Sequence, residues 1–191
     1  DGSTGYSSLM VARKDSGFKT VADLKGKKLG FADPDSTSGY LVPNVALPAA
    51  IGMPVKEFFS ETSFGGGHEN LVLGVLDHKF DAGTTFGSGV GDWAEGYSSG
   101  NLHTMVAKGI LDTDDIVELW RSPLIPNGPL MVSNKLPEDM KGKVEAFFKD
   151  LPGKDLACFQ GFTGGENTGF TEVDASFYQT IIDARKSVIG G

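Results

Sequence analysis

Short apolar runs along the chain alternate with stretches in which apolar positions recur every three or four residues. The runs at 6–12, 28–32, 81–85, 116–120 and 130–132 have the length and composition of strands. The intervening stretches predict helices at 20–26, 36–50, 67–77, 137–148 and 175–188, with a further one from about residue 89. This alternation indicates an α/β fold with a mostly parallel sheet.

The transition from the second strand to its helix carries the most informative chemistry. Ser36, Thr37 and Ser38 stand at the predicted N-cap and first turn, and Gly39 follows them. The first amides of a helix lack intrahelical acceptors and carry the positive end of the macrodipole. A plain cap needs only one hydroxyl. Three hydroxyls followed by a glycine, which lets the backbone approach a ligand, therefore favour a seat for a small oxyanion.

Two more loops are expected at the same edge of the sheet. A triple glycine at 65–67 precedes His68 at the next helix start, which predicts a second group of backbone amides with His68 as a candidate donor. The strand at 81–85 ends on Thr85, a candidate for a third wall of the site. Ordinary turns and caps have the same composition, so that simpler interpretation stays open for both loops.

Charge and composition narrow the class of partner. The chain has 191 residues, 39% of them apolar, and a formal net charge of −8, which repels nucleic acid and anionic membrane surfaces. No nucleic-acid partner is expected. An anionic ligand must be held by local dipoles, because the summed field of the chain repels it.

The sequence lacks the patterns of metal sites and of common hydrolases. Cys158 is the only cysteine, and none of the three histidines are spaced i,i+4, so neither a disulfide nor a structural zinc site is expected. No G-x-S-x-G elbow and no Walker-type phosphate loop occurs. These absences favour binding without catalysis, with no cofactor, no metal and no catalytic residue.

Two segments have the character of connections between separate bodies. One is the strand at 6–13, and the other is 121–129, in which three prolines favour a stiff, extended crossing.

Several of these segments together resemble one family. They are Tyr6–Gly17, Leu24–Lys28, Asp33–Pro43 and Trp120–Leu130, and through them nearly the whole chain is similar to the phosphonate-binding subunit of ABC transporters, the PhnD type of type II periplasmic binding protein. In that family a Ser-Thr-Ser-Gly motif at a helix N-terminus holds the phosphonate oxygens, which carries over to Ser36, Thr37 and Ser38. The histidine of the glycine-rich loop matches His68.

The resemblance also implies an architecture. Two α/β lobes joined by two crossing strands would enclose the ligand. Residues 14–121 would form one complete, doubly wound lobe, and 1–13 and 122–191 the crossing strands and the C-terminal part of the second lobe. Thr85 and Asn127 would line the ligand region, where no carboxylate is available for an aminoalkyl group, so phosphonate, phosphite and phosphate all remain candidate ligands.

The resemblance further implies partners and location. The chain would deliver its ligand to an ABC transporter membrane permease in the periplasm, and it could pair with a chain that supplies the rest of the second lobe. It begins without Met or a signal peptide, as expected of a processed protein or a fragment. Two alternatives share the fold: a phosphate-handling enzyme that uses His68 as acid or base, and the ligand-sensing domain of a signalling protein.

Overall fold

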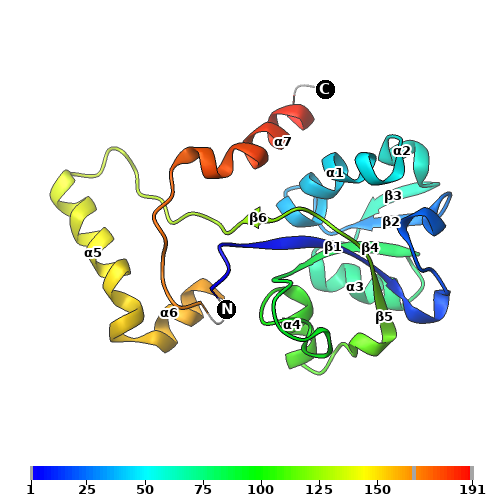
Figure 1. Ribbon diagram of the computed structural model, residues 1–191, viewed down its shortest axis with the longest axis horizontal. Coiled ribbons are helices and arrows are strands. Elements are labelled where there is room, and N and C mark those ends of the chain that lie inside the picture. Colours follow the sequence, from blue (N-terminus) through cyan, green and yellow to red (C-terminus); the bar gives the residue numbers. More distant parts are fainter. Residues whose placement is uncertain (1, 165–166, 190–191) are drawn as a thin grey trace.

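A mixed β-sheet forms the centre of the larger part of the molecule (Figure 1). The computed structural model describes residues 2–164 and 167–189. Within this part of the chain the strand order is β3-β2-β4-β1-β5, and β6 pairs with the start of β1. The strands are β1 (Gly5–Arg13), β2 (Lys28–Phe31), β3 (Glu61–Phe64), β4 (Ala82–Gly87), β5 (Ile116–Arg121) and β6 (Ile125–Pro126).

The direction of β1 departs from the sequence expectation. β2 runs parallel to β3 and β4, but β1 runs antiparallel to β4, β5 and β6. The expectation of a mostly parallel sheet is therefore wrong, because an apolar run buried on both faces does not reveal the direction of its neighbours. The crossing strand predicted at 6–13 is also part of this sheet, since Ser7–Ala12 of β1 pair with β4.

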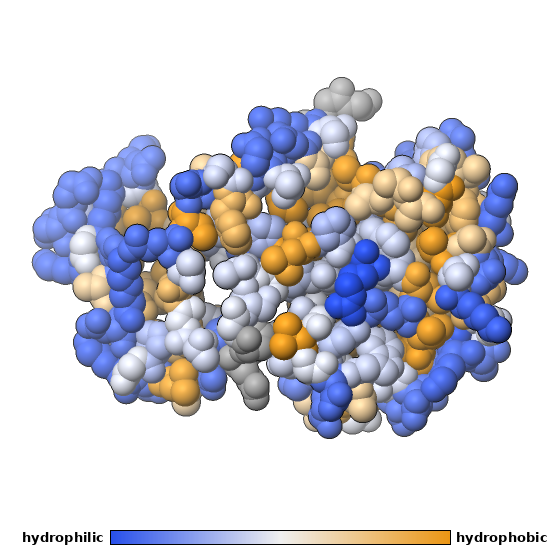
Figure 2. Space-filling view, viewed as in Figure 1, coloured by the Kyte–Doolittle hydropathy of each residue, from blue (hydrophilic) through white to orange (hydrophobic). Residues whose placement is uncertain are grey.

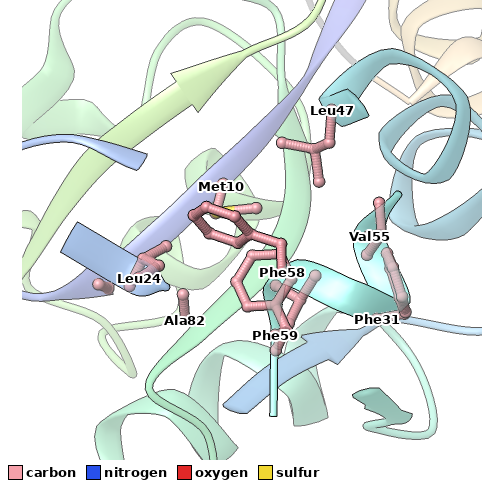
Figure 3. Packing of buried hydrophobic residues seen from close by; sticks show 10 residues of the cluster. Met10, Leu24, Phe31, Leu47, Val55, Phe58, Phe59 and Ala82 are labelled. Carbon is pink, nitrogen blue, oxygen red and sulfur yellow. The ribbon is translucent and has the colours of Figure 1, made fainter. Parts of the chain in front are cut away.

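Two layers of helices cover the sheet, and β1 supplies side chains to both. Met10 and Ala12 join the core under α1 (Val42–Ile51) and α2 (Val55–Phe58), which Figure 3 shows around Met10, Leu47 and Phe58. Leu9 and Val11 join the core under α3 (His68–Leu76) and α4 (Asn101–Ala107). Successive strand residues face opposite sides, so one apolar run fills two cores.

Local signals explain where the elements begin and end. The short 3₁₀ helix η2 (Val21–Leu24) starts at a capping box between Thr20 and Asp23. α1 has Pro43 in its first turn. Its C-cap is Gly52, whose φ of 73° is unfavourable for a residue with a side chain.

Some element predictions were wrong. The helix expected from residue 89 is only the 3₁₀ turn η4 (Trp93–Glu95), and residues 130–132 form no strand. β3, α4 and α6 (Leu156–Thr163) were not predicted. The sequence of β3, Glu-Thr-Ser-Phe, is too polar to be recognised as an apolar run. Such polarity is typical of a strand at the edge of a sheet, which is where β3 lies.

Two of the C-terminal helices, α5 (Glu138–Lys154) and α6, lie away from the sheet, whereas α7 (Gln179–Ile189) lies beside α1 (Figure 1). α5 and α6 pack on each other, and α7, preceded by the turn η6 (Ala175–Tyr178), lies against α1 and the turn η3 (Thr37–Leu41). Among the described residues beyond 126, only Leu151 and Phe159 are buried apolar side chains. Apolar patches therefore reach the surface of these segments as well as of the sheet-containing part, as Figure 2 shows on one face.

Over the described residues, none of the helices combines the length and the apolar character that crossing a membrane requires.

Candidate functional site

The predicted loops meet at one edge of the sheet. β2, β3 and β4 are parallel, so their carboxyl ends lie together, and the segments that follow β2 and β3 are hydrogen-bonded to each other. The Gly65 amide donates to the Phe31 carbonyl at 2.8 Å, and the Gly67 amide donates to the Ala32 carbonyl at 2.8 Å. The glycines at 65–67 thus bring His68, the first residue of α3, beside the loop that follows β2.

The three hydroxyl residues lie in a wide turn before α1. Ser36 is the N-cap of η3, a π-helical turn, and its carbonyl accepts the amides of Tyr40 at 3.1 Å and Leu41 at 3.0 Å. Its Oγ accepts the Gly39 amide at 2.9 Å. Within the described residues, the amides of Thr37 and Ser38 donate to no protein acceptor. These are the first-turn donors expected to be available to an anion.

Gly39 is required by close packing. A Cβ added there would lie 2.4 Å from the Ala32 Cβ, 2.8 Å from the His68 Cε1 and 2.9 Å from the Ser36 Oγ. Its carbonyl accepts from the Ala32 amide at 3.0 Å and from the Thr84 Oγ1 at 2.6 Å. The glycine therefore lets the turn sit directly on the end of β2, against the imidazole.

His68 contacts the turn through its Nε2, which is 2.9 Å from the Ser36 Oγ. The edge of its ring packs on Phe86, with centroids 4.7 Å apart. Burial lowers the pKa of His68 to about 4, although the negative charge of Asp33 opposes this shift. The imidazole is consequently neutral at neutral pH.

The neutral imidazole has two tautomers with different consequences for Ser36. With the proton on Nε2, His68 donates to the Ser36 Oγ, and the serine hydroxyl hydrogen is free to donate to an anion. With the proton on Nδ1, Ser36 must donate to His68, and a buried N–H is left unpaired, because Nδ1 has no hydrogen-bond partner among the described residues. Within the same residues Nδ1 lacks a partner in the other tautomer too, but there it is an unpaired acceptor, which proteins tolerate more often than an unpaired N–H. The arrangement thus favours a serine that is free to donate outward.

Ser38 is held through its backbone. Its carbonyl accepts from the Ser8 Oγ at 2.6 Å. Burial raises the pKa of the nearby Tyr6, and the Ser38 side chain opposes this rise. Thr37 is partly exposed, with no side-chain hydrogen bond among the described residues. Ser8, Thr84 and Tyr6 were missed by sequence reasoning, and the only signal for them was the run of hydroxyls in otherwise apolar strands.

Two predicted site residues lie apart from this cluster. Thr85 is fully buried, and its Oγ1 accepts from the Asn101 side chain at 3.0 Å, on the opposite face of β4 from Thr84. Asn127 is exposed on the crossing segment, where its amide donates to the Thr4 carbonyl at 3.1 Å and its carbonyl accepts from the Tyr178 hydroxyl at 3.1 Å. The structure brings together Ser36, Thr37, Ser38, Gly39 and His68, but not these two.

The cluster formed by Ser36–Gly39 and His68 is polar but contains no cationic side chain. In the described part of the chain, no arginine or lysine hydrogen-bonds to Ser36, Thr37, Ser38 or His68. No three His, Cys, Asp or Glu side chains gather as a metal site within the same residues. Two hollows of the described part of the chain lie elsewhere, one of about 190 Å³ beside Tyr40 and Phe64 and one of about 590 Å³ beside Arg13 and His78.

The chain is similar to a known protein family and to individual proteins of known name. Residues 1–178 match the family described as "ABC transporter, phosphonate, periplasmic substrate-binding protein". The chain is 30% identical over 152 residues to the phosphonates-binding periplasmic protein of Escherichia coli (strain K12), covering 78% of this chain and 41% of that protein. It is 28% identical to the phosphate-import protein PhnD of Mycolicibacterium smegmatis, covering 96% and 56%. The chain thus spans about half the length of these curated relatives.

Solved structures give the same result. The binding protein component of an ABC phosphonate transporter from Pseudomonas aeruginosa matches with a TM-score of 0.71 and 26% identity, covering 96% of this chain and 58% of that one. PhnD1 from Prochlorococcus marinus, solved with methylphosphonate, matches in fold with a TM-score of 0.67 at 19% identity, covering 97% and 68%. The expected α/β, type II periplasmic binding protein fold is thereby confirmed for the part that the chain spans.

The family matched over residues 1–178 consists of substrate-binding proteins, not enzymes. The chain belongs to the family of periplasmic substrate-binding proteins of phosphonate ABC transporters.

Proposed function

We propose that this chain carries the oxyanion seat of a periplasmic protein that captures a phosphonate, phosphite or phosphate for an ABC importer. The observation that carries the proposal is the cluster at the end of β2, where the amides of Thr37 and Ser38 and the hydroxyl of Ser36 converge beside a neutral His68. These groups are donors at a helix start, the arrangement that binds tetrahedral anions.

The seat works through dipoles. An anion bound there accepts hydrogen bonds from the free amides, from Ser36 and from the partly exposed Thr37 hydroxyl. Hydrogen bonds to a charged acceptor are about twice as strong as neutral ones. Gly39 contributes by its lack of a side chain, which lets the turn and His68 approach each other. Thr85 and Asn127 are not assigned a contact with the anion, because their hydrogen bonds to Asn101 and Thr4 place them outside the cluster.

The partner proposals rest on family membership and on the apolar surface. A membrane permease would receive the ligand in the periplasm, as the family description implies. We also propose that the segments beyond 126 pair with polypeptide that completes the second lobe. The exposure of Phe147 (57%), Phe162 (56%) and Met131 (80%) supports such pairing, since large apolar side chains are costly in water.

The test is calorimetric titration of the protein, expressed with any natural sequence that precedes residue 1. The ligands are 2-aminoethylphosphonate, methylphosphonate, phosphite and phosphate. Ser36→Ala combined with Thr37→Ala should weaken binding of the preferred ligand roughly 100-fold or more, because two charge-assisted hydrogen bonds are removed. Ser60→Ala removes an exposed hydroxyl that bonds to the Lys27 carbonyl, remote from the seat, and serves as the matched control.

Unchanged affinity in the double variant would show that the seat is elsewhere. Turnover of a phosphate ester that depends on His68 would instead favour an enzyme on the same fold.

A further inference from the structure

Two buried hydroxyls outside the seat hold consecutive carbonyls of the turn. The Ser8 Oγ, on β1, donates to the Ser38 carbonyl at 2.6 Å. The Thr84 Oγ1, on β4, donates to the Gly39 carbonyl at 2.6 Å. Ser8 and Thr84 are both completely buried, so neither hydroxyl is itself exposed to a ligand.

Their effect reaches Ser36 because peptide groups are planar. The carbonyl of Ser38 and the amide of Gly39 belong to one peptide plane and point in opposite directions. Fixing that carbonyl on Ser8 therefore aims the Gly39 amide, which donates to the Ser36 Oγ at 2.9 Å.

The next peptide plane repeats the arrangement. Its carbonyl, from Gly39, accepts from the Thr84 hydroxyl as well as from the Ala32 amide, and its amide, from Tyr40, donates to the Ser36 carbonyl at 3.1 Å. Ser8 thus orients the amide that hydrogen-bonds to the Ser36 side chain, and Thr84 orients the amide that hydrogen-bonds to the Ser36 carbonyl. The two strand hydroxyls together determine where the first hydroxyl of the seat lies.

The two faces of the sheet determine which strand residues can reach the turn. Ser8 is paired with Phe86 and Met10 with Thr84 in the β1–β4 register, so Ser8 and Thr84 lie on the same face of the sheet, under the turn. Thr85 has the same burial as Thr84 but lies on the other face and bonds to Asn101. Of these neighbouring threonines, only one reaches the turn.

Ser8 also joins the turn to the second crossing segment. Its amide donates to the Ser122 Oγ at 3.0 Å, and its carbonyl accepts the Ser122 amide at 2.9 Å. The residue that holds Ser38 is therefore one of those through which the two crossing segments are hydrogen-bonded.

We propose that Ser8 and Thr84 are positioning residues of the oxyanion seat, which set the direction of the Gly39 and Tyr40 amides and so place Ser36 for the ligand. This inference rests on the proposed function. It assigns the affinity of the seat partly to two residues that do not touch the anion.

The experiment compares Ser8→Ala and Thr84→Val with two controls. Thr84→Ser keeps the hydroxyl and loses only a methyl group. Thr113→Val makes the same exchange as Thr84→Val at another buried threonine, whose hydroxyl donates to the Ala94 carbonyl. Methylphosphonate and phosphate affinities are measured by calorimetry. Amide hydrogen exchange of Gly39 and Tyr40 is measured by NMR without ligand, with Val72 in the α3 core as the reference amide.

Ser8→Ala and Thr84→Val should each weaken binding roughly three- to tenfold, the effect of one net hydrogen bond. Exchange of Gly39 should accelerate in Ser8→Ala and that of Tyr40 in Thr84→Val, with no change at Val72. Thr84→Ser should restore affinity to within about twofold of the original protein, and Thr113→Val should leave affinity unchanged. A purely structural role would not produce this separation.

Ser36→Ala in the same series distinguishes failure of the positioning role from failure of the seat itself. If it abolishes binding while Ser8→Ala and Thr84→Val keep full affinity, the positioning role is refuted and the seat stands. If Ser36→Ala itself binds normally, both the seat and the positioning role are refuted. A loss in Thr113→Val equal to that in Thr84→Val, or no rescue by Thr84→Ser, would also overturn the positioning role.

Discussion

At the scale of single residues, His68 shows how burial decides chemistry. Its sequence position beside three glycines predicted a donor to the oxyanion. The structure directs Nε2 to the Ser36 Oγ and leaves Nδ1 buried without a partner among the described residues. Because burial lowers its pKa to about 4, His68 is neutral, and in the proposed seat it would act on the ligand through the serine rather than as an imidazolium.

Replacing His68 should therefore affect binding equally at pH 6 and pH 8. His68→Ala is expected to weaken methylphosphonate binding by the same factor at both values, since neither lies near a pKa of about 4. Calorimetric titration at the two pH values measures this ratio. A larger loss at pH 6 would mean that a charged imidazole contacts the anion.

The same pKa predicts how stability depends on pH. The folded pKa lies below the ordinary value of 6.5, so between these values the unfolded chain binds a proton that the folded chain excludes. Stability from this residue is complete above pH 6.5 and falls, by on the order of 2–3 kcal/mol, as the pH approaches 4. His68→Gln should have a flatter pH profile over this window in urea unfolding. Parallel profiles for the two proteins would contradict the shift.

At the scale of elements, the turn η3 and the strand β4 determine which hydroxyls lie at the proposed seat. The wide π-type turn carries both the Tyr40 and the Leu41 amides to the Ser36 carbonyl, a geometry that often marks functional positions in helices. The two-residue period of β4 sends Thr84 to this turn and Thr85 to α4. Sequence reasoning selected Thr85, because two adjacent threonines cannot be assigned to faces without the neighbouring strands.

Gly39→Ala tests the turn as a unit. Its Cβ would lie 2.4 Å from the Ala32 Cβ, so the turn must move, and we expect a loss of about 1–3 kcal/mol in stability together with loss of ligand binding. Gly142→Ala is the matched control, because nothing lies within 4 Å of a Cβ at that helical position. It should stabilise α5 by roughly 0.5–1 kcal/mol. Urea unfolding and calorimetry report both effects, and normal binding by Gly39→Ala would refute the close approach of the turn.

At the scale of the whole molecule, the burial of apolar side chains is uneven. The sheet and its four covering helices contain three apolar clusters. Beyond residue 126 the described part of the chain buries only Leu151 and Phe159, although Phe148, Phe162 and Phe170 form aromatic contacts there. Local stability follows buried apolar contact, so the two parts should differ in stability.

Hydrogen exchange measured by mass spectrometry should detect this difference. Peptides from 138–163 are expected to exchange roughly 100-fold faster than peptides from β1, because few apolar contacts oppose local opening of α5 and α6. Addition of polypeptide that completes the second lobe should slow the exchange of 138–163 selectively. Equal protection of both regions in the isolated chain would contradict this prediction.

The sequence alone determined the local chemistry of the seat. Three hydroxyls and a glycine after an apolar run, and a second glycine-rich loop before His68, are short-range patterns whose meaning depends on helix starts and strand ends. They predicted that Ser36–Gly39 and His68 would lie together, as they do, and they carried the resemblance to the phosphonate-binding family. The α/β class followed from periodicity in the same way.

Only the tertiary structure decided the direction of β1, the neutral state of His68 and the positions of Ser8 and Thr84. Each depends on what packs against a residue from a distant part of the chain: β4 and β5 against β1, Phe86 against His68, and the turn against two strand hydroxyls. Strand direction, burial and hydrogen-bond pairing are relations between segments, and the pattern within one segment does not contain them.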